Sequence, residues 1–349
     1  MKNAPARLVY LERFAHPVAM GLLESRPHIE AHCLELDWDK ERLWAEFAEA
    51  HVYQIRATRS ELPAELFANT EFLARCPQLL AVSTNGSGAD TIDLAACTAA
   101  GVLVVNQAGG NKEAVAEHAI GMMLCLTKRI FEADHAVRTV PNLRREDLMG
   151  HDIFGRTLGI IGLGHIGKRV SELARNLFQM KVIAHDPFID DSDFAANGAE
   201  KADLESLLSR ADFITVHCPR NPSSEHMIDA KALAHVQPHA YYVNTARGGI
   251  HVESDLADAL REKRIAGAGL DVWEREPPPL DHPLLGFDNV IVSPHTAGVT
   301  HEARTNVVTG TIEQIDDIVS ARRAPRILNP EVWDRYCDRF DVIFGRRPT

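Results

Sequence analysis

The sequence predicts an α/β protein with two parallel sheets. Two blocks of the 349-residue chain each alternate short apolar runs with segments whose apolar residues recur at helical spacing. Alternation of strand, helix and strand implies right-handed crossovers and mostly parallel pairing. A nominal domain length of roughly 150 residues also gives about two domains.

The first block occupies about the first hundred residues. Its apolar runs predict buried strands at Leu8–Leu11, Val52–Ile55, Leu79–Val82 and Val102–Val105. Helical spacing predicts helices at Val18–Ser25, Glu41–Ala50, Ala64–Arg75 and Thr91–Ala100. A long helix is then expected from Asn111 to about Val140, where Pro141 ends it.

The second block begins at Leu158 and predicts six strands, which fit the six-stranded dinucleotide-binding arrangement. These strands are Leu158–Ile161, Lys181–Ala184, Phe213–Val216, Tyr241–Val243, Gly267–Leu270 and Val290–Val292. Another long helix is expected from His301 to about Ala321. The tail from Arg322 is expected to return and pack on the first domain.

Composition excludes several classes of protein. The chain has 37 Lys and Arg against 49 Asp and Glu, a net charge of −12, which speaks against a nucleic-acid partner. No apolar run approaches ~18 residues, so no membrane span is expected. The six cysteines form no CxxC pair, so neither a metal site nor a redox dithiol is expected. Scattered cysteines and a poor match to a signal peptide indicate a cytoplasmic protein.

A glycine-rich run follows the first strand of the second block and opens a helix. In this run, Gly162 permits a tight turn, Gly164 lets the backbone approach a pyrophosphate, and Gly167 allows close packing of helix on strand. The helix N-terminus attracts the pyrophosphate through its N–H groups and dipole. Asp186 lies 19 residues after Gly167, near the spacing of about 20 expected for an acid that binds the ribose.

Three later strands are each followed by a charged or titratable residue. Arg247 lies in NTARGG, Glu276 in LDVWEREPP and His295 in PHTAG. Each residue taken alone has an ordinary structural alternative, such as a surface ion pair or a turn. Because parallel folds bind ligands at the carboxyl ends of their strands, the ordered set beside a nucleotide loop predicts a catalytic site.

These motifs, with GLGHIG, HCP and NQAGGNKEAVAEHA, resemble the D-isomer-specific 2-hydroxyacid dehydrogenases over nearly the whole chain. The resemblance implies a flavodoxin-like substrate domain, residues 1–108 and 302–349, and an inserted NAD-binding Rossmann domain, residues 109–301. It implies NAD as the cofactor and a small anionic 2-hydroxy or 2-keto acid as the substrate. It also suggests a homodimer built by the helix at 111–140 and the arm Pro141–Phe154.

The resemblance carries over site residues one by one. Arg247 and Glu276 match the catalytic arginine and glutamate, His295 matches the acid/base histidine, and Asp271 matches a residue that holds the nicotinamide amide. The full set implied to bind the cofactor is Gly162, Gly164, His165, Ile166, Gly167, Asp186, His217, Cys218, Pro219, Thr245, Ala246, Arg247, Asp271, His295, Ala297 and Gly298. Cys218 is assigned contact with the cofactor and no redox role.

The residue types suit the reduction of a 2-keto acid. A histidine exchanges a proton near neutral pH, and a carboxylate such as Glu276 fixes its tautomer and favours imidazolium. An arginine offers a two-pronged donor to a carboxylate and keeps its charge. Asp186, followed by further acids and no base, predicts a preference for NAD(H) over NADP(H).

The loop from Asn85 to Asp93 is the expected second contact with the substrate. Its glycines expose N–H groups that can hold a carboxylate, and the resemblance assigns this to Ser87 and Gly88. Thr91 stands where the family commonly has Asn, and Ala108 replaces a usual proline. Because of these two differences, the sequence does not determine the shape of the substrate pocket. Arg56 and Arg59 are candidates for a distal anionic group of the substrate, with surface solvation as the alternative.

Two other functions remain open from the sequence. One is an NAD(H)-sensing binding protein of the corepressor type, which shares the fold. The other is a dehydrogenase of a different small anion, formate or phosphite. Turnover of a panel of 2-keto acids distinguishes the first of these from a reductase.

Overall fold

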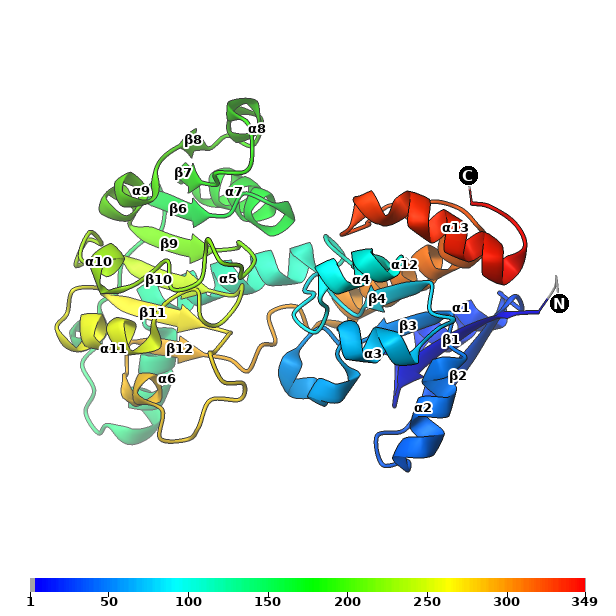
Figure 1. The fold of residues 1–349 in the computed structure, drawn as a ribbon. Helices are drawn as coiled ribbons and strands as arrows, with labels where there is room; N and C mark the ends of the chain where they lie inside the picture. The colour runs from blue at the N-terminus through cyan, green and yellow to red at the C-terminus, as the bar shows by residue number, and fades with distance from the viewer. Residues whose placement is uncertain (1–3, 349) are drawn as a thin grey trace. The chain divides into compact units, whose positions relative to one another are not determined.

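The computed structural model describes residues 4–348, and the chain forms two compact α/β units (Figure 1). Unit 1 comprises Met1–Asn111 and Thr300–Thr349, and unit 2 comprises Lys112–Val299. From the sequence, the first segment of unit 1 was expected to end at residue 108, and it ends three residues later, at Asn111. Its second segment was expected to begin at residue 302, and it begins two residues earlier, at Thr300.

Unit 1 is built on a five-stranded sheet in the order β2-β1-β3-β4-β5, with every pair parallel. The strands are β1 Ala6–Leu11, β2 Ile29–Leu34, β3 Val52–Ile55, β4 Ala81–Thr84 and β5 Leu103–Val105. This is the flavodoxin-like strand order, so the fold class predicted for this unit is confirmed. Strand β2 was missed because it lies at the edge of the sheet, where its IEAHCL segment is half-exposed and forms no apolar run.

Six α-helices belong to unit 1 within the described part of the chain. They are α1 Val18–Glu24, α2 Lys40–Ala48, α3 Thr70–Arg75, α4 Leu94–Ala100, α12 His301–Val319 and α13 Trp333–Phe344. The single helix predicted over 64–75 is wrong: a 3₁₀ turn, Ala64–Leu66, precedes α3, because the Asn69 side chain accepts from the Phe72 N–H and starts a new helix. Asp93 likewise delays the start of α4 by accepting from the Ala96 N–H.

Apolar residues on both faces of this sheet hold unit 1 together. On one face, Tyr53 and Ile55 pack with Phe47 of α2. On the other, Leu8 and Leu103 pack with residues of α12 and α13, including Tyr336 and Phe340. The expected return of the tail onto the first domain is therefore confirmed.

Unit 2 contains a parallel seven-stranded sheet in the order β12-β11-β10-β9-β6-β7-β8. Its strands are β6 Thr157–Ile161, β7 Lys181–His185, β8 Glu200–Lys201, β9 Phe213–Val216, β10 Tyr241–Asn244, β11 Gly267–Leu270 and β12 Val290–Val292. Counted within the unit, the order is 3-2-1-4-5-6 with a seventh strand added, so the predicted Rossmann arrangement is confirmed. Strand β8 escaped the sequence analysis because it is two exposed residues long.

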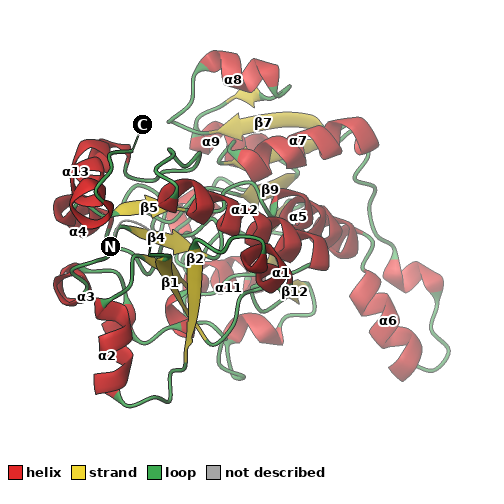
Figure 2. Ribbon diagram, turned by 90° about the vertical axis from the view of Figure 1, so that its right-hand side faces the viewer, coloured by secondary structure: helices red, strands yellow, loops and turns green. Residues whose placement is uncertain are grey.

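The helices of unit 2 are α5 Lys112–Thr127, α6 Ile130–Thr139, α7 His165–Phe178, α8 Asp191–Ala196, α9 Leu204–Arg210, α10 Ala230–Leu233 and α11 Glu253–Arg261. The single helix predicted from Asn111 to Val140 is wrong. Arg129 adopts a left-handed conformation, with φ 52°, and breaks the chain into α5 and α6. Its guanidinium pairs with Glu132 and donates to the Asp147 carbonyl at 2.9 Å, so tertiary contacts hold this bend. Figure 2 shows α6 set apart from the sheet.

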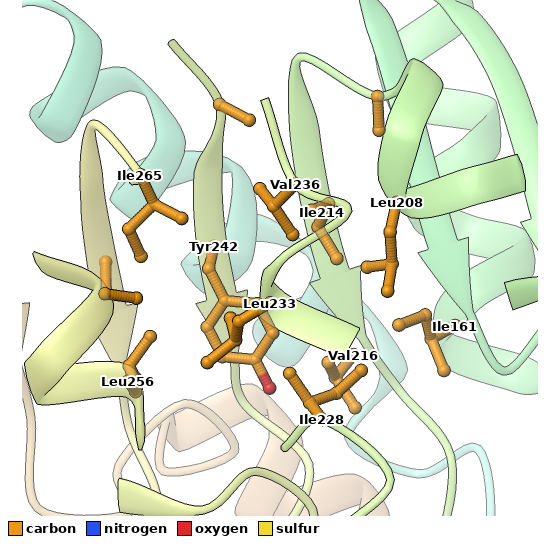
Figure 3. Packing of buried hydrophobic residues seen from close by; sticks show 14 of the residues in the cluster. Ile161, Leu208, Ile214, Val216, Ile228, Leu233, Val236, Tyr242, Leu256 and Ile265 are labelled. Carbon is orange, nitrogen blue, oxygen red and sulfur yellow. The ribbon is translucent and has the colours of Figure 1, made fainter. Parts of the chain in front are cut away.

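Alternate strand residues of unit 2 enter cores on opposite faces of the sheet. Phe213 and Val243 pack with α5 and α7 on one face. The other face packs against α9, α10 and α11, and Figure 3 shows Ile161, Leu208, Ile214, Val216, Leu233, Tyr242 and Leu256 in that cluster. Burial on both faces is typical of parallel sheets and leaves the strand ends as the sites for polar function.

Across residues 4–348, the helices are too short or too polar to cross a membrane.

Candidate active site

The glycine-rich loop after β6 has a shape that only glycine permits at two positions. Gly162 has φ 92°, and a Cβ there would lie 2.6 Å from the Cys218 nitrogen. A Cβ at Gly167 would lie 2.2 Å from the Gly162 carbonyl oxygen, so this glycine lets α7 pack on the loop. At Gly164 a Cβ would meet nothing within 4 Å, which leaves open space beside the loop.

The N-terminus of α7 fits the pyrophosphate of a dinucleotide. Gly164 is the N-cap, and it has no side chain that could cap the first N–H groups. His165 and Ile166 begin the helix, with His165 exposed and Ile166 half-buried. The fourteen-residue helix therefore presents its N–H groups and positive dipole end to the open space at Gly164.

Asp186 follows the end of β7 and ties the loop in place. One carboxylate oxygen accepts from the Leu163 N–H at 2.9 Å, and the other accepts from the Phe188 N–H at 3.1 Å. Each oxygen retains a lone pair, and the residue is half-buried. The structure adds a loop-fixing role to Asp186, and its contact with a ribose stays a prediction.

The segment after β9 presents neutral groups beside the glycine loop. Burial lowers the pKa of His217 to about 3, so its imidazole is uncharged, and its Nε2 contacts the Thr215 hydroxyl at 2.9 Å. Burial likewise raises the pKa of Cys218 to about 11, which keeps the thiol protonated. Pro219, the next residue, is exposed. A protonated thiol agrees with the contact role, without redox chemistry, expected for Cys218.

A tight turn after β10 places Arg247. The Asn244 side chain accepts from the Ala246 N–H at 2.9 Å and donates to the Arg247 carbonyl at 3.0 Å. Arg247 also donates through Nη1 to the Ala246 carbonyl at 2.7 Å. Thr245 is buried, and its hydroxyl has no partner within the described residues. No role was predicted for Asn244 from the sequence, although it begins the NTARGG motif that contains Arg247.

His295 and Glu276 form a hydrogen-bonded pair. His295 Nδ1 lies 2.8 Å from Glu276 Oε2, and the two side chains are 30% and 18% exposed. The other Glu276 oxygen accepts from the Trp273 N–H at 3.2 Å. The pairing therefore leaves Nε2 of His295 as the ring nitrogen that can act on another molecule.

Glu276 is ionised at neutral pH. Burial alone raises the pKa of this carboxyl, but the hydrogen bond and charge of His295, the Trp273 N–H and the charge of Arg247 together hold it below its ordinary value. Of these influences on the pKa of Glu276, the charge of Arg247 is the smallest. Arg247, Glu276 and His295 come from the loops after three neighbouring strands, β10, β11 and β12.

Asp271 fixes the backbone that carries His295. Its side chain is fully buried, and it accepts from the Ser293 hydroxyl at 2.5 Å and from the N–H groups of Thr296 and Ala297 at 2.8 and 2.9 Å. Its carbonyl accepts from the His295 N–H at 2.6 Å. His295 has φ 56°, a left-handed conformation costing about 1–2 kcal/mol for a non-glycine residue, and these bonds offset that cost. The expected contact of Asp271 with a nicotinamide amide stays a prediction.

His118 of α5 extends this network. Its Nε2 lies 3.1 Å from the Ser293 hydroxyl, so α5 supports the loop that ends at the half-buried Gly298. Sequence analysis overlooked both His118 and Ser293. His118 lies inside the quoted motif NQAGGNKEAVAEHA, and Ser293 directly precedes PHTAG.

In unit 1, Asn106 and Gln107 hold the predicted substrate loop through its carbonyl groups. The Ser87 carbonyl accepts from the Asn106 side chain at 2.8 Å, and the Gly86 carbonyl accepts from the Gln107 N–H at 2.9 Å. Within the part of the chain that the structure describes, the N–H groups of Ser87 and Gly88 have no acceptor. The loop is therefore ordered with donors available, as a carboxylate site requires.

The two candidate arginines of unit 1 have different surroundings. Arg56 pairs with the Glu12 carboxylate and donates to the Glu61 carbonyl at 3.0 Å. Arg59 donates to the Asp90 carbonyl at 2.8 Å and so braces the substrate loop. Each guanidinium already donates to a neighbouring carbonyl. Both arginines therefore have fewer donors left for a distal anionic group of the substrate.

Among residues 4–348, no three His, Cys, Asp or Glu side chains gather as a metal-binding group.

Comparisons with known proteins define the family. Residues 120–297 match the profile described as the NAD binding domain of D-isomer specific 2-hydroxyacid dehydrogenases. The chain is 37% identical over 300 residues to D-3-phosphoglycerate dehydrogenase of Mycobacterium leprae, covering 85% of this chain and 55% of that protein. It is 38% identical over 253 residues to (S)-sulfolactate dehydrogenase of Chromohalobacter salexigens, covering 72% and 81%. The apo-structure of D-lactate dehydrogenase from Escherichia coli superimposes with a TM-score of 0.75 at 27% identity, covering 92% and 99%.

The chain therefore belongs to the D-isomer specific 2-hydroxyacid dehydrogenase family, and unit 2 contains that family's NAD-binding domain. The chain spans a little over half the length of the phosphoglycerate dehydrogenase that it matches. Its similarity to (S)-sulfolactate dehydrogenase covers most of that protein. These relatives act on different acids, so the similarity defines a family rather than a substrate.

Proposed function

We propose that this protein is an NAD-dependent oxidoreductase that interconverts a small D-2-hydroxy acid and the corresponding 2-keto acid. The observation that carries the proposal is the 2.8 Å pairing of His295 with an ionised Glu276 in the same unit as the glycine loop. Bound NADH supplies the hydride for C2 of the keto acid. The remaining requirements, a proton and a site for the carboxylate, are met by this chain's own residues.

His295 supplies the proton. Because Nδ1 is bonded to Glu276, Nε2 faces the reacting oxygen and donates to it as negative charge develops in reduction. Glu276 stabilises the imidazolium from which that proton comes, and in the oxidative direction the neutral ring accepts the proton back. Asp271 acts on the backbone and keeps the ring in position.

Arg247 binds the carboxylate of the substrate. Its guanidinium matches a carboxylate with two parallel donors and remains charged at any working pH. In unit 1, the N–H groups of Ser87 and Gly88 are further candidate donors to a carboxylate. A carboxylate held by the planar donor pair of Arg247 orients C2 for attack, which is how positioning lowers a barrier.

The function is tested by following oxidation of NADH with glyoxylate, pyruvate, hydroxypyruvate and longer 2-keto acids. We expect turnover of at least one acid and formation of the D-hydroxy acid. Formate and phosphite are assayed in the same series with NAD as oxidant, and turnover of either one alone would replace the substrate assignment. Binding of NADH without any turnover would favour a sensing protein and would overturn the proposal.

We predict a clear preference for NADH over NADPH. The negative charge of Asp186, at the position expected for a ribose-binding acid, would repel the 2′-phosphate of NADPH. The nearby basic side chains are already paired, Lys201 with Asp191 and Lys168 with Asp193. The measurement is kcat/KM for both cofactors in the wild type and in Asp186→Ala, where the preference is expected to narrow.

Two variants control this experiment. Asp186→Asn retains an oxygen acceptor for the Leu163 N–H and removes the charge, so it separates repulsion from loosening of the loop. Asp190→Ala removes an exposed acid from the same segment and should change the preference little. Equal or better use of NADPH by the wild type would contradict the role of Asp186.

We further propose that the protein works as a homodimer in the cytoplasm. The six cysteines are free, which suits a reducing compartment. Large apolar side chains on α6 and the arm that follows are strongly exposed: Ile130, Phe131, Val137, Val140, Met149 and Phe154. Exposed apolar residues clustered on one segment indicate a protein interface.

The dimer is tested with a charge placed in this segment. Val137, which is 75% exposed, is replaced by Glu, and light scattering coupled to size exclusion is expected to show a monomer instead of a dimer. Val342→Glu places the same charge at an exposed position on α13 and should leave the dimer intact. A wild-type monomer would contradict the assignment.

A further inference from the structure

His251 is a fully buried histidine of unit 2 that the mechanism above does not use. It lies between the turn that carries Arg247 and helix α11. Bonds of the main chain hold it on both sides: the Ile228 N–H donates to the Ile250 carbonyl at 3.1 Å, and the Val252 N–H donates to the Ile228 carbonyl at 3.0 Å. A substitution of the His251 side chain therefore leaves these bonds in place.

The imidazole of His251 is uncharged and accepts a hydrogen bond. Its Nδ1 lies 3.0 Å from Nδ2 of the Asn244 side chain, which only donates, so Nδ1 is the acceptor and the proton is on Nε2. Burial, with a smaller effect from the charge of His282, lowers the pKa of His251 to about 4 and keeps the ring neutral at neutral pH. The ring also packs edge-to-face with Tyr242, which Figure 3 labels, with ring centroids 5.5 Å apart.

The hydrogen bond to His251 determines which way the Asn244 amide faces. Asn244 is fully buried, its side-chain oxygen accepts from the Ala246 N–H at 2.9 Å, and its Nδ2 also donates to the Arg247 carbonyl at 3.0 Å. Reversing the amide would set its oxygen against two acceptors, the Arg247 carbonyl and Nδ1 of His251. His251 thus adds to the bonds that hold the turn in one conformation.

The backbone of this turn lies directly against the loop that carries Glu276. A Cβ at Gly248 would overlap the carbonyl group of Trp273, so main chain packs on main chain at this point. A shift of the turn that carries Arg247 would therefore also disturb the loop that carries Glu276.

Stability alone does not explain a histidine at this position. Nε2 of His251 is buried and has no partner within residues 4–348. A buried N–H without an acceptor destabilises a fold, and an apolar side chain would avoid that penalty. The feature that an apolar side chain could not supply is the acceptor at Nδ1.

We propose that His251 is a positioning residue for Arg247: by accepting from Asn244, it fixes the turn that holds the guanidinium in place for the carboxylate of the substrate. The inference rests on the proposed function for the role of Arg247 in binding that carboxylate. It rests on the hydrogen bonds within unit 2 alone for the fixing of the turn.

Two substitutions, His251→Asn and His251→Gln, separate positioning from packing. An asparagine oxygen can take the place of Nδ1, whereas a glutamine oxygen reaches the place of Nε2 but fills more of the space of the ring. Positioning predicts that asparagine is the better replacement, and packing predicts the reverse. We expect KM for the keto acid to rise roughly 10-fold in His251→Gln, the effect of one buried hydrogen bond, and much less in His251→Asn. The affinity for NADH, measured by fluorescence titration, should be nearly unchanged in both.

His51→Gln is the matched control. His51 is half-buried in unit 1, and its Nδ1 also accepts, from the Arg7 N–H at 2.8 Å. The substitution removes the same kind of hydrogen bond away from Arg247, so KM should stay at the wild-type value. A double-mutant cycle then tests the route: in an Asn244→Ala background, His251→Gln should raise KM no further.

Hydrogen exchange of the turn gives a readout that does not depend on the reaction. Mass spectrometry of peptides that cover residues 244–250 should show faster exchange in His251→Gln than in the wild type, because the Ala246 N–H loses its acceptor whenever the Asn244 amide turns away. Exchange in His251→Asn and His51→Gln should stay near that of the wild type.

The outcomes separate this inference from the proposed function. A KM in His251→Asn that equals or exceeds that in His251→Gln, or an effect of His251→Gln that persists in the Asn244→Ala background, overturns the positioning role and leaves the function standing. If the wild type reduces no keto acid, the function falls and hydrogen exchange decides. Faster exchange in His251→Gln alone then supports the fixing of the turn, and equal exchange in all variants overturns it.

Discussion

Replacing His295 with Gln is expected to lower turnover of the keto acid by ~10²- to 10⁴-fold, the usual contribution of a general acid. Glutamine fills a similar space and can hydrogen-bond to Glu276, but it cannot deliver a proton to the developing alkoxide. The affinity for NADH, measured by fluorescence titration, should stay nearly unchanged because the glycine loop is untouched.

A second histidine–glutamate pair provides the control. His235 lies 3.5 Å from Glu205 and is 42% exposed in the same unit, so His235→Gln makes the same chemical change outside the strand-end loops. It should retain wild-type turnover. Full activity in His295→Gln would remove the acid/base role from this residue.

The pH profile of Glu276→Gln checks the partner of His295. Glu276 has a lowered pKa, so it is negatively charged across the neutral range and stabilises the imidazolium of His295. Glutamine is neutral, so the imidazolium is lost at lower pH. The reductive rate should therefore decline at lower pH than in the wild type, and an unchanged profile would show that the carboxylate does not act through His295.

Arg247→Lys is expected to reduce kcat/KM for the keto acid by roughly 10- to 100-fold, although the positive charge is kept. Lysine presents a single ammonium in place of a planar two-pronged donor, and it loses the bond by which Arg247 Nη1 reaches the Ala246 carbonyl. The ability to bind NADH should be kept. Steady-state kinetics with one keto acid and titration with NADH measure the two effects.

Two comparisons make the Arg247 experiment specific. An aldehyde or ketone of similar size without a carboxylate should be reduced slowly by both enzymes and show little difference between them. Arg261→Lys changes an exposed arginine of α11 and should leave KM and kcat for the keto acid unchanged. A normal KM and kcat in Arg247→Lys would mean that the carboxylate is bound elsewhere.

Residues with strong local signals were predicted correctly from sequence. Apolar runs located strands such as β3 and β9, whose bounds match the expected ones. The glycine loop was identified because close packing at Gly162 and Gly167 tolerates no side chain, and that demand is written directly in the sequence. Elements without such signals were missed, notably the half-exposed edge strand β2 and the short, exposed edge strand β8.

Other features depended on contacts between distant parts of the chain. The break at Arg129 requires the partner Asp147, eighteen residues away, and apolar periodicity alone favoured one continuous helix. The role of Asp271 in holding the His295 loop depends on bonds across 22 to 26 residues. His118 joins that network from 175 residues away, which no local pattern encodes.

By itself, the sequence determined the α/β class, the nucleotide loop and the identity of the arginine, glutamate and histidine, because periodicity, glycine spacing and residue chemistry are local properties of the chain. Only the tertiary structure decided that His295 and Glu276 pair at 2.8 Å, and that Asp271 is buried and hydrogen-bonded to the loop that carries His295. Distances, burial and unsatisfied hydrogen bonds arise when segments far apart in the chain pack together. They are therefore properties of the fold and not of any one segment.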